Sequence, residues 1–253
     1  MGDSVGAVYS GACEVNELGQ SIGKAVPDWS PASAPPHRRM DGRFCRLVPL
    51  DPSEHSRELF EAFALDHEGR NWTYLPHGPF FEFSLFERWM GAVCRQDDIQ
   101  FYAIIDLVAD RAVGIASYLR IQPDAGSIEV GYLNFSPLLQ RRPAATEAMY
   151  LMMRRAFSEL GYRRYEWKCD VLNAASRQAA TRLGFRFEGV FRQANVYKRR
   201  DRDTAWFSVL DREWRALEPA YEEWLAGVEA SPERLQIESL NAIIKRHVAA
   251  LES

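Results

Sequence analysis

Cysteine is scarce in this 253-residue sequence, and a surplus of basic residues is absent. The four cysteines, Cys13, Cys45, Cys94 and Cys169, form no C-x-x-C pair and have no histidine cluster beside them, so neither a disulfide framework nor a metal site is expected. Lysine and arginine together number 31 against 35 for aspartate and glutamate, which gives a formal net charge of -4. Because a general nucleic-acid surface needs a basic surplus, we expect no nucleic-acid partner.

Long hydrophobic runs and targeting signals are missing as well. The most apolar window, residues 101–109, is interrupted by Asp106 and is too short to span a bilayer. The first residues lack a basic segment followed by an apolar stretch, so no secretory signal is expected. A chain that is 47% hydrophobic and 26% charged is typical of a globular protein. We therefore expect a cytoplasmic protein with no membrane partner.

The chain divides by pattern into three parts. Residues 1–40 show little periodicity and end in a stretch rich in proline and serine, which predicts an arm or linker. Residues 41–215 predict the order β-α-α-β-β-β-α-β-α-β-β, with the strands of residues 100–135 forming an antiparallel meander. Residues 216–253 predict a helical extension. Its apolar side chains Ile237, Leu240, Ile244, Val248 and Leu251 lie near one face, so the extension is expected either to dock on the body or to form a homodimer.

The most informative segment is residues 127–157, where a predicted strand ends in a short polar loop that opens into a helix. The first amides of a helix lack intrahelical partners and lie at its positive end, so an anion is favoured there. Gln140, Arg141 and Arg142 add side-chain donors at this point. Many such junctions bind nothing, and the two arginines are equally compatible with a solvated surface.

Two motifs in order resemble a known family. Residues 140–148, QRRPAATEA, resemble the acyl-CoA pyrophosphate loop of the GCN-five-related N-acetyltransferase (GNAT) superfamily, and residues 173–185, NAASRQAATRLGF, resemble its second signature. The resemblance spans about residues 43–215 and is nearest to the ribosomal-protein N-terminal acetyltransferases. It implies an α/β fold with a central mixed, mostly antiparallel twisted sheet flanked by helices, in which two central strands splay apart and acetyl-CoA lies in the gap.

The same resemblance implies which residues contact acetyl-CoA, with no metal required. They are Leu133, Asn134, Phe135, Gln140, Arg141, Arg142, Ala144, Ala145, Thr146 and Asn173. The sequence departs from the family pattern at two positions. Pro143 stands where a glycine is usual and removes one amide donor, although proline suits the first turn of a helix. Ala180 stands where many relatives have a catalytic tyrosine.

Two residues are candidates for proton transfer. The resemblance suggests Glu129 as the general base, acting directly or through water, and its alternation with Ile128 and Val130 places it on the opposite strand face from them. The alternative is a half-buried structural carboxylate. Ser176 matches a serine that can reach the CoA sulfur in the ribosomal-protein branch and is the candidate acid. Asn173 and Ser176 also suit the first turn of a capped helix.

Residues 71–80 form an aromatic loop between two predicted helices that, in this superfamily, wall the acceptor pocket. Trp72, Tyr74 and His77 are candidate substrate contacts, because aromatic rings bind ammonium groups and histidine titrates near neutral pH. Each of these rings is equally compatible with covering the core. The basic run at residues 198–202 is expected to form a solvated hairpin tip.

The sequence thus predicts an acetyl-CoA-dependent N-acetyltransferase that acts on a primary amine in a ternary complex. The bulky loop at residues 71–80 favours a small-molecule amine. Two alternatives stay open: a protein N-terminal acetyltransferase, and a non-catalytic acyl-CoA-binding module suggested by Pro143 and Ala180.

Overall fold

The computed structural model describes residues 13–230 and 238–252 and divides into two compact units, residues 1–31 and 32–253. In the first unit, β1 (Cys13–Val15) pairs with β2 (Ser21–Gly23) as an antiparallel hairpin. The Asn16 side chain accepts hydrogen bonds from the amides of Leu18 and Gln20 and so holds the turn. The weak periodicity of this region gave no indication of the hairpin.

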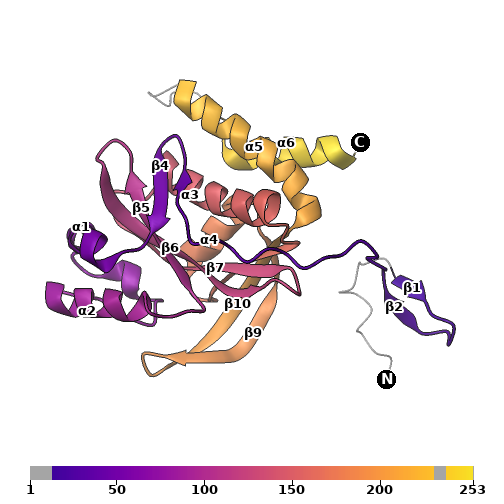
Figure 1. Cartoon of the computed structure of the whole chain (residues 1–253), viewed down its shortest axis with the longest axis horizontal. Coiled ribbons are helices and arrows are strands. Elements are labelled where there is room, and N and C mark those ends of the chain that lie inside the picture. Colours follow the sequence, from indigo (N-terminus) through magenta and orange to yellow (C-terminus); the bar gives the residue numbers. More distant parts are fainter. Residues whose placement is uncertain (1–12, 231–237, 253) are drawn as a thin grey trace. The chain divides into compact units, whose positions relative to one another are not determined.

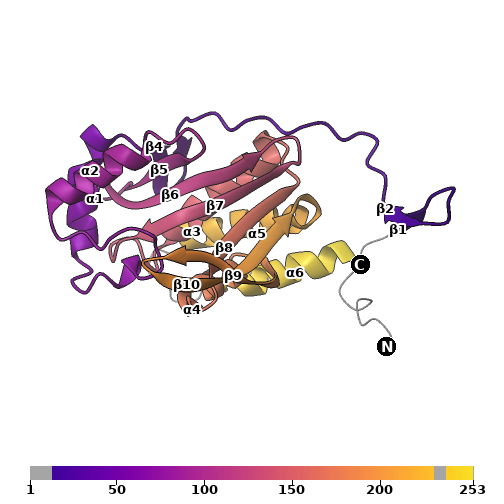
Figure 2. The same ribbon diagram turned by 90° about the horizontal axis from the view of Figure 1, so that it is seen from below.

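The second unit holds an eight-stranded sheet with helices on both faces (Figures 1 and 2). Its strands are β3 (Met40–Asp41), β4 (Cys45–Pro49), β5 (Gln100–Asp106), β6 (Arg111–Gln122), β7 (Ser127–Phe135), β8 (Arg164–Asp170), β9 (Arg186–Tyr197) and β10 (Arg200–Leu210). Its helical elements are α1 (Pro52–Ala64), the short turn η2 (Arg70–Trp72), α2 (Phe83–Val93), α3 (Pro143–Arg154), its wider last turn η3 (Arg155–Glu159), α4 (Ala174–Arg182), α5 (Asp211–Ala230) and α6 (Leu240–Glu252).

The order across the sheet is β3-β4-β5-β6-β7-β8-β10-β9. Strands β7 and β8 are parallel, and the other neighbouring strands in this order are antiparallel. The β-α-α-β-β-β-α-β-α-β-β order expected for residues 41–215 is confirmed from β4 to β10, and the short strand β3 precedes it. The meander of β5, β6 and β7 is confirmed as well.

Alternation along β5 divides the core into two layers. Phe101, Ala103 and Ile105 pack with apolar side chains of α1 and α2, whereas Tyr102 and Ile104 pack in the larger cluster that contains α3, α4 and α5. Successive side chains of a strand point to opposite faces, so a run buried on both sides is expected for a central strand. Figures 1 and 2 show α1 and α2 together, away from α3, α5 and α6.

The helices begin where the sequence indicates. The Asp51 side chain accepts from the Ser53 amide before α1, and the Asn173 side chain accepts from the Ser176 amide before α4. Each side chain satisfies an amide that would otherwise lack a partner at a helix start. Pro143 occupies the first position of α3, where its missing amide hydrogen costs little.

Residues 32–40, part of the predicted arm, lie on the second unit. The Ala32 amide donates to the Pro123 carbonyl over 3.1 Å and the Ser33 amide to the Leu160 carbonyl over 2.9 Å. Arg155 donates from its guanidinium to the Arg38 and Arg39 carbonyls. The compact unit therefore starts at residue 32, eight residues before the end of the predicted arm.

The C-terminal extension packs against the same unit. Leu240, Ile243 and Ile244 of α6 are buried in the larger core cluster and Val248 packs against it, while Leu251 is 60% exposed. Ile237 lies outside the described residues. The apolar face of α6 therefore docks within the chain, and Leu251 does not take part. No helix in the described ranges is long and apolar enough to cross a membrane.

Candidate active site

Strands β7 and β8 separate partway along their length. Their parallel pairing runs from Ser127 opposite Arg164 to Val130 opposite Trp167 and then stops. On its other side, β7 stays paired with β6 as far as Phe135. Residues 131–135 of β7 therefore have a partner strand on one edge only, and a row of backbone groups on the other edge faces the gap.

A β-bulge lies where the two strands separate. The register between β6 and β7 shifts between the pair Ile115 and Asn134 and the pair Ser117 and Gly131, so two residues of β7, Tyr132 and Leu133, stand where β6 supplies one. Tyr132 has a φ of 49°, the left-handed region typical of a bulge position. The bulge follows directly after Val130, the last residue of β7 that pairs with β8.

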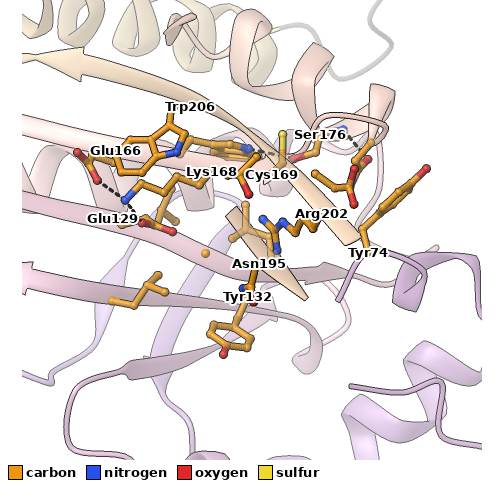
Figure 3. A pocket seen from close by; sticks show the side chains of 18 of the residues that line it. Tyr74, Glu129, Tyr132, Glu166, Lys168, Cys169, Ser176, Asn195, Arg202 and Trp206 are labelled. Carbon is orange, nitrogen blue, oxygen red and sulfur yellow. Dashed lines mark hydrogen bonds and ion pairs between the residues drawn. The ribbon is translucent and has the colours of Figure 1, made fainter. Parts of the chain in front are cut away.

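A cavity of about 630 Å³ lies at this opening. Its walls come from β6, β7, β8, the β9–β10 hairpin, the start of α4 and the loop after η2 (Figure 3). The charged side chains that line it are Arg120, Glu129, Glu166, Lys168, Asp170 and Arg202. A polar, balanced charge set in a concave site at a sheet opening is typical of a small-molecule site.

Glu129 lies on the cavity wall and is buried, with 3% of its surface exposed. Its two carboxylate oxygens pair with two cations: Oε1 lies 2.7 Å from Arg120, and Oε2 lies 2.8 Å from Lys168 Nζ. Lys168 also lies 2.7 Å from Glu166 and 3.6 Å from the centre of the Trp206 ring. The predicted base thus belongs to an ionic network, and the pairs of Lys168 with Glu129 and Glu166 are drawn as dashed lines in Figure 3.

Glu166 connects this network to the outer part of the sheet. Burial favours the neutral form of this carboxyl, but hydrogen bonds from Lys168 and Arg164 outweigh that effect and hold its pKa below its usual value. Arg164 also pairs with Glu188 on β9 over 2.5 Å. The carboxyl group of Glu166 is therefore held in its charged form, and two cations fix its position.

Ser176, the predicted acid, also lines the cavity. Its hydroxyl oxygen accepts a hydrogen bond of 2.9 Å from the Trp167 indole N–H, so the hydroxyl can act as a donor to another group. Burial raises the pKa of the neighbouring Cys169 thiol, and a hydrogen bond from Ser176 opposes that shift. Asn173 lines the cavity too and caps α4 through Ser176. The capping role of Asn173 is confirmed, and the two proton-transfer roles stay predictions.

The loop before α3 differs in detail from the expectation. The Gln140 side chain donates to Asn71 and to the Phe135 carbonyl over 2.9 and 2.8 Å, so it connects the end of β7 to η2. Arg141 has a φ of 59° and Arg142 stands at the N-cap of α3, and both side chains are exposed. The amide of Ala144, in the first turn, has no intrahelical partner. This end of α3 offers a backbone donor and two solvent-facing guanidinium groups.

The remaining predicted cofactor residues lie nearby in different surroundings. Leu133 lines the cavity, whereas Asn134 is buried and no partner for its side-chain amide occurs among the described residues. Ala145 is buried in the core. Thr146 is also buried, and its hydroxyl accepts a hydrogen bond of 3.1 Å from Arg182 of α4. Arg182 therefore places a further guanidinium near the start of α3, which the motifs did not indicate.

The aromatic loop contributes less to the cavity than expected. Tyr74 lines it and donates its hydroxyl to the Leu172 carbonyl over 3.1 Å. Trp72 is only 3% exposed and packs edge-on against Phe63 and Phe80, so its predicted substrate contact is corrected to core packing. His77 is outside the cavity lining, and burial, together with the charge of Lys198, lowers its pKa.

The β9–β10 hairpin supplies site residues that the sequence analysis missed. Arg202, expected at a solvated tip, lines the cavity with Asn195 and Tyr197. Lys198 also departs from that expectation, since its ammonium donates to the Trp72 carbonyl over 2.6 Å. The spacing of Arg202, Thr204 and Trp206 along β10 could have indicated a shared face.

Comparison with known proteins supplies the context for this geometry. The family description "Acetyltransferase (GNAT) domain" matches residues 45–186, more than half of the chain. No curated protein matches the sequence.

Several solved structures resemble the chain. A GCN5-related N-acetyltransferase from Brucella melitensis is 43% identical with a TM-score of 0.84, covering 87% of this chain and 100% of its own. A probable acetyltransferase of the GNAT family from Chromobacterium violaceum is also 43% identical, with a TM-score of 0.70 and coverage of 76% and 96%. An acetyltransferase from Salmonella typhimurium, described as modifying the N-terminal serine of ribosomal protein L7/L12, is 18% identical with a TM-score of 0.57 and coverage of 68% and 99%, and shows the fold alone.

Proposed function

Because this chain belongs to the GNAT superfamily of N-acetyltransferases, we propose that it transfers the acetyl group of acetyl-CoA to a primary amine of a small molecule within a ternary complex. The observation that carries the proposal is the one-sided edge of β7 at residues 131–135, which borders a cavity with Glu129 and Glu166, both paired with Lys168, on its wall. An open strand edge can accept an extended chain as an additional strand.

The residues on the donor side suit acetyl-CoA, the donor of GNAT enzymes. Backbone groups of residues 131–135 would pair with the pantetheine chain, which contains amides. The Ala144 amide, the positive end of α3 and the guanidinium groups of Arg141 and Arg142 would bind the diphosphate. When bound, acetyl-CoA supplies an activated acetyl thioester. Pro143 leaves one fewer amide for this contact, and the exposed arginines offset that loss.

The mouth of the cavity is tied together by contacts between distant segments. Lys198 of the hairpin turn binds the Trp72 carbonyl, Tyr74 binds the Leu172 carbonyl before α4, and Gln140 binds Asn71. These contacts connect η2 and the loop after it to the hairpin, to the segment before α4 and to the loop before α3. An enclosure of this kind suits a small amine better than a peptide chain, which needs an open groove.

Two residues would move protons during transfer. An amine attacks only as the neutral base, so its proton must leave first, and Glu129 is the carboxylate on the cavity wall that would take it, directly or through a water. Both of its oxygens are held by cations, which fixes the position of the carboxylate. Ser176 would give its hydroxyl proton to the departing thiolate, while Trp167 holds the oxygen.

The test is release of free CoA thiol from acetyl-CoA in the presence of a panel of small amines and a panel of peptides with free N-termini. We expect turnover with one or more small amines and none with the peptides. Turnover of peptides alone would overturn the small-molecule assignment. Binding of acetyl-CoA without turnover of any amine would overturn the enzymatic role and favour a binding module.

A further inference from the structure

We propose that Arg202 binds a carboxylate of the acceptor, so that the substrate is an amino acid or a similar molecule with a carboxylate close to its primary amine. This inference rests on the function proposed above and names the substrate class for the same cavity. Arg202 has no part in the two sequence motifs, and its side chain enters the cavity from the β9–β10 hairpin (Figure 3).

The guanidinium of Arg202 is left without an acidic partner. Among the residues that the structure describes, no carboxylate oxygen lies within 4.0 Å of it, and its Nε atom is buried with no hydrogen-bond partner. Its positive charge acts on the thiol of Cys169, which lines the same cavity. Burial raises the pKa of the Cys169 thiol, and Arg202 works against that shift. A buried guanidinium nitrogen without a partner is costly, so an anionic ligand is favoured at this position.

The other charges on the cavity wall already have partners. Glu129 pairs with Arg120 and Lys168, and Glu166 pairs with Lys168. Asp170 accepts a hydrogen bond of 2.8 Å from the Tyr197 hydroxyl and another from the Leu172 amide. Among the described charged residues of the wall, Arg202 is therefore the one without an oppositely charged or hydrogen-bonded partner for its guanidinium, and it can bind an anionic ligand.

Asn195 lies opposite Arg202 and adds a neutral hydrogen-bond donor to this wall. The two residues face each other in the register of β9 and β10, and both line the cavity. The side-chain oxygen Oδ1 of Asn195 accepts a hydrogen bond from the Val196 amide over 2.8 Å, which leaves the side-chain N–H groups of Asn195 to donate to a ligand. A planar guanidinium and an amide donor on one wall match the two oxygens of a carboxylate.

The diphosphate of acetyl-CoA is not expected to bind Arg202. The loop and helix start that would bind the diphosphate, residues 140–146, do not line this cavity, whereas Arg202 does. The charge of this guanidinium lowers the pKa of the Cys169 thiol against the effect of burial. Cys169 lies beside Ser176, on the wall from which acetyl transfer would proceed. A molecule with its amine near its carboxylate can span these two positions.

This placement distinguishes among acceptors. A polyamine carries only positive charge and is disfavoured beside an unpaired guanidinium. A peptide N-terminus has an amide where an amino acid has its α-carboxylate. An amino acid supplies both the amine and the anion, so we expect a preference for acceptors that carry a carboxylate next to the amine.

The experiment pairs each amino acid of a panel with the amine that lacks its carboxyl group and measures kcat/KM for both by thiol release. We expect the carboxylate-bearing member of a pair to be preferred by about 10- to 100-fold, the range of a charge-assisted hydrogen bond. Equal rates within the pairs, or a preference for the decarboxylated member, would overturn the proposal.

The Arg202→Gln variant tests the residue itself. It is expected to lower kcat/KM for the amino acid by about 10- to 100-fold, chiefly through KM, and to leave the decarboxylated amine within about twofold. Arg200→Gln is the matched control, because Arg200 is exposed on the same strand and does not line the cavity. Equal losses for both acceptors in Arg202→Gln would indicate a structural role instead.

A binding measurement keeps this claim separate from the proposed function. Calorimetry in the presence of CoA compares an N-acetyl amino acid with the N-alkylacetamide that lacks the carboxylate. We expect only the first to bind, and Arg202→Gln to abolish the difference. If no amine is acetylated but this difference is present, the proposed function fails and the carboxylate site stands. Equal binding of the two compounds to the native protein would overturn the carboxylate site.

Discussion

Removal of Lys168 should destabilise the protein strongly. Its ammonium lies 2.8 Å from one carboxylate oxygen of Glu129 and 2.7 Å from one of Glu166, so these two oxygens are at most about 5.5 Å apart. All three side chains are largely buried, with exposed fractions of 4%, 8% and 13% for Glu129, Lys168 and Glu166. Without the cation, two negative charges face each other inside the sheet.

The structure sets the size of the effect. At an effective dielectric constant of about 20, two like charges about 5.5 Å apart repel by about 3 kcal/mol. Measured losses on breaking a buried ion pair are about 3–5 kcal/mol. The Lys168→Met variant should therefore lose about 3–5 kcal/mol of unfolding free energy at pH 7, a large share of the 5–15 kcal/mol typical of a domain.

Urea denaturation followed by circular dichroism measures this loss. Lys245→Met is the matched control, because Lys245 is exposed on α6 and its replacement should change stability by less than about 0.5 kcal/mol. A loss below about 1 kcal/mol for Lys168→Met, or one equal to that of the control, would refute the view that the network is energetically coupled.

The pH dependence supplies an independent check. Burial alone would raise the pKa of Glu166, but Lys168 and Arg164 hold it below its ordinary value of 4.5. The stabilisation linked to this depressed pKa is fully present above pH 4.5 and is lost as the pH falls through the folded-state value. The difference between native protein and Lys168→Met should therefore be largest near neutral pH and smaller at pH 4.

Four other outcomes are expected. Glu129→Gln should lower kcat by about two to four orders of magnitude, the usual scale for a lost general base, with acetyl-CoA affinity unchanged in calorimetry; a near-normal rate would assign Glu129 a structural role. Ser176→Ala should lower kcat by about 100-fold without weakening acetyl-CoA binding, and an unaltered kcat would exclude it as the acid. Because burial lowers the pKa of His77, the native protein should lose melting temperature as the pH falls below 6.5, and His77→Gln should reduce that loss; identical melting profiles would contradict this. Ile243→Ala, at a site 3% exposed, should cost about 2–5 kcal/mol in urea denaturation, whereas Leu251→Ala, at a site 60% exposed, should cost less than about 0.5 kcal/mol, and equal costs would mean that α6 does not pack as described.

Local patterns in the sequence were sufficient to predict most of the sheet and its helices. Asn173 is the capping residue at the helix start that it suggested, and the alternating strands of residues 100–135 form the expected meander. The short hairpin at Cys13–Val15 and Ser21–Gly23 has exposed side chains only. It therefore lacks the apolar alternation that reveals a strand.

The candidate site was predictable only where motifs mark it. Glu129 and Ser176 became candidates through the resemblance of their segments to the family. Lys168 pairs with carboxylates on another strand, and Arg202 reaches the cavity because the hairpin folds over it. Such contacts depend on the tertiary arrangement, which local spacing does not encode. For Trp72 the sequence left two roles open, a substrate contact or core packing. An aromatic loop gives no indication of which of its rings is buried.

Hydrogen exchange with and without acetyl-CoA tests most directly whether the opened edge of β7 receives the donor. Residues 131–135 are paired with β6 on one side only, so their amides that face the gap have no strand partner. Acetyl-CoA should slow exchange in a peptide covering residues 131–136 and in one covering the start of α3, and leave the β1–β2 hairpin unchanged. Unaltered exchange at residues 131–136, with acetyl-CoA bound and protection elsewhere, would contradict the account.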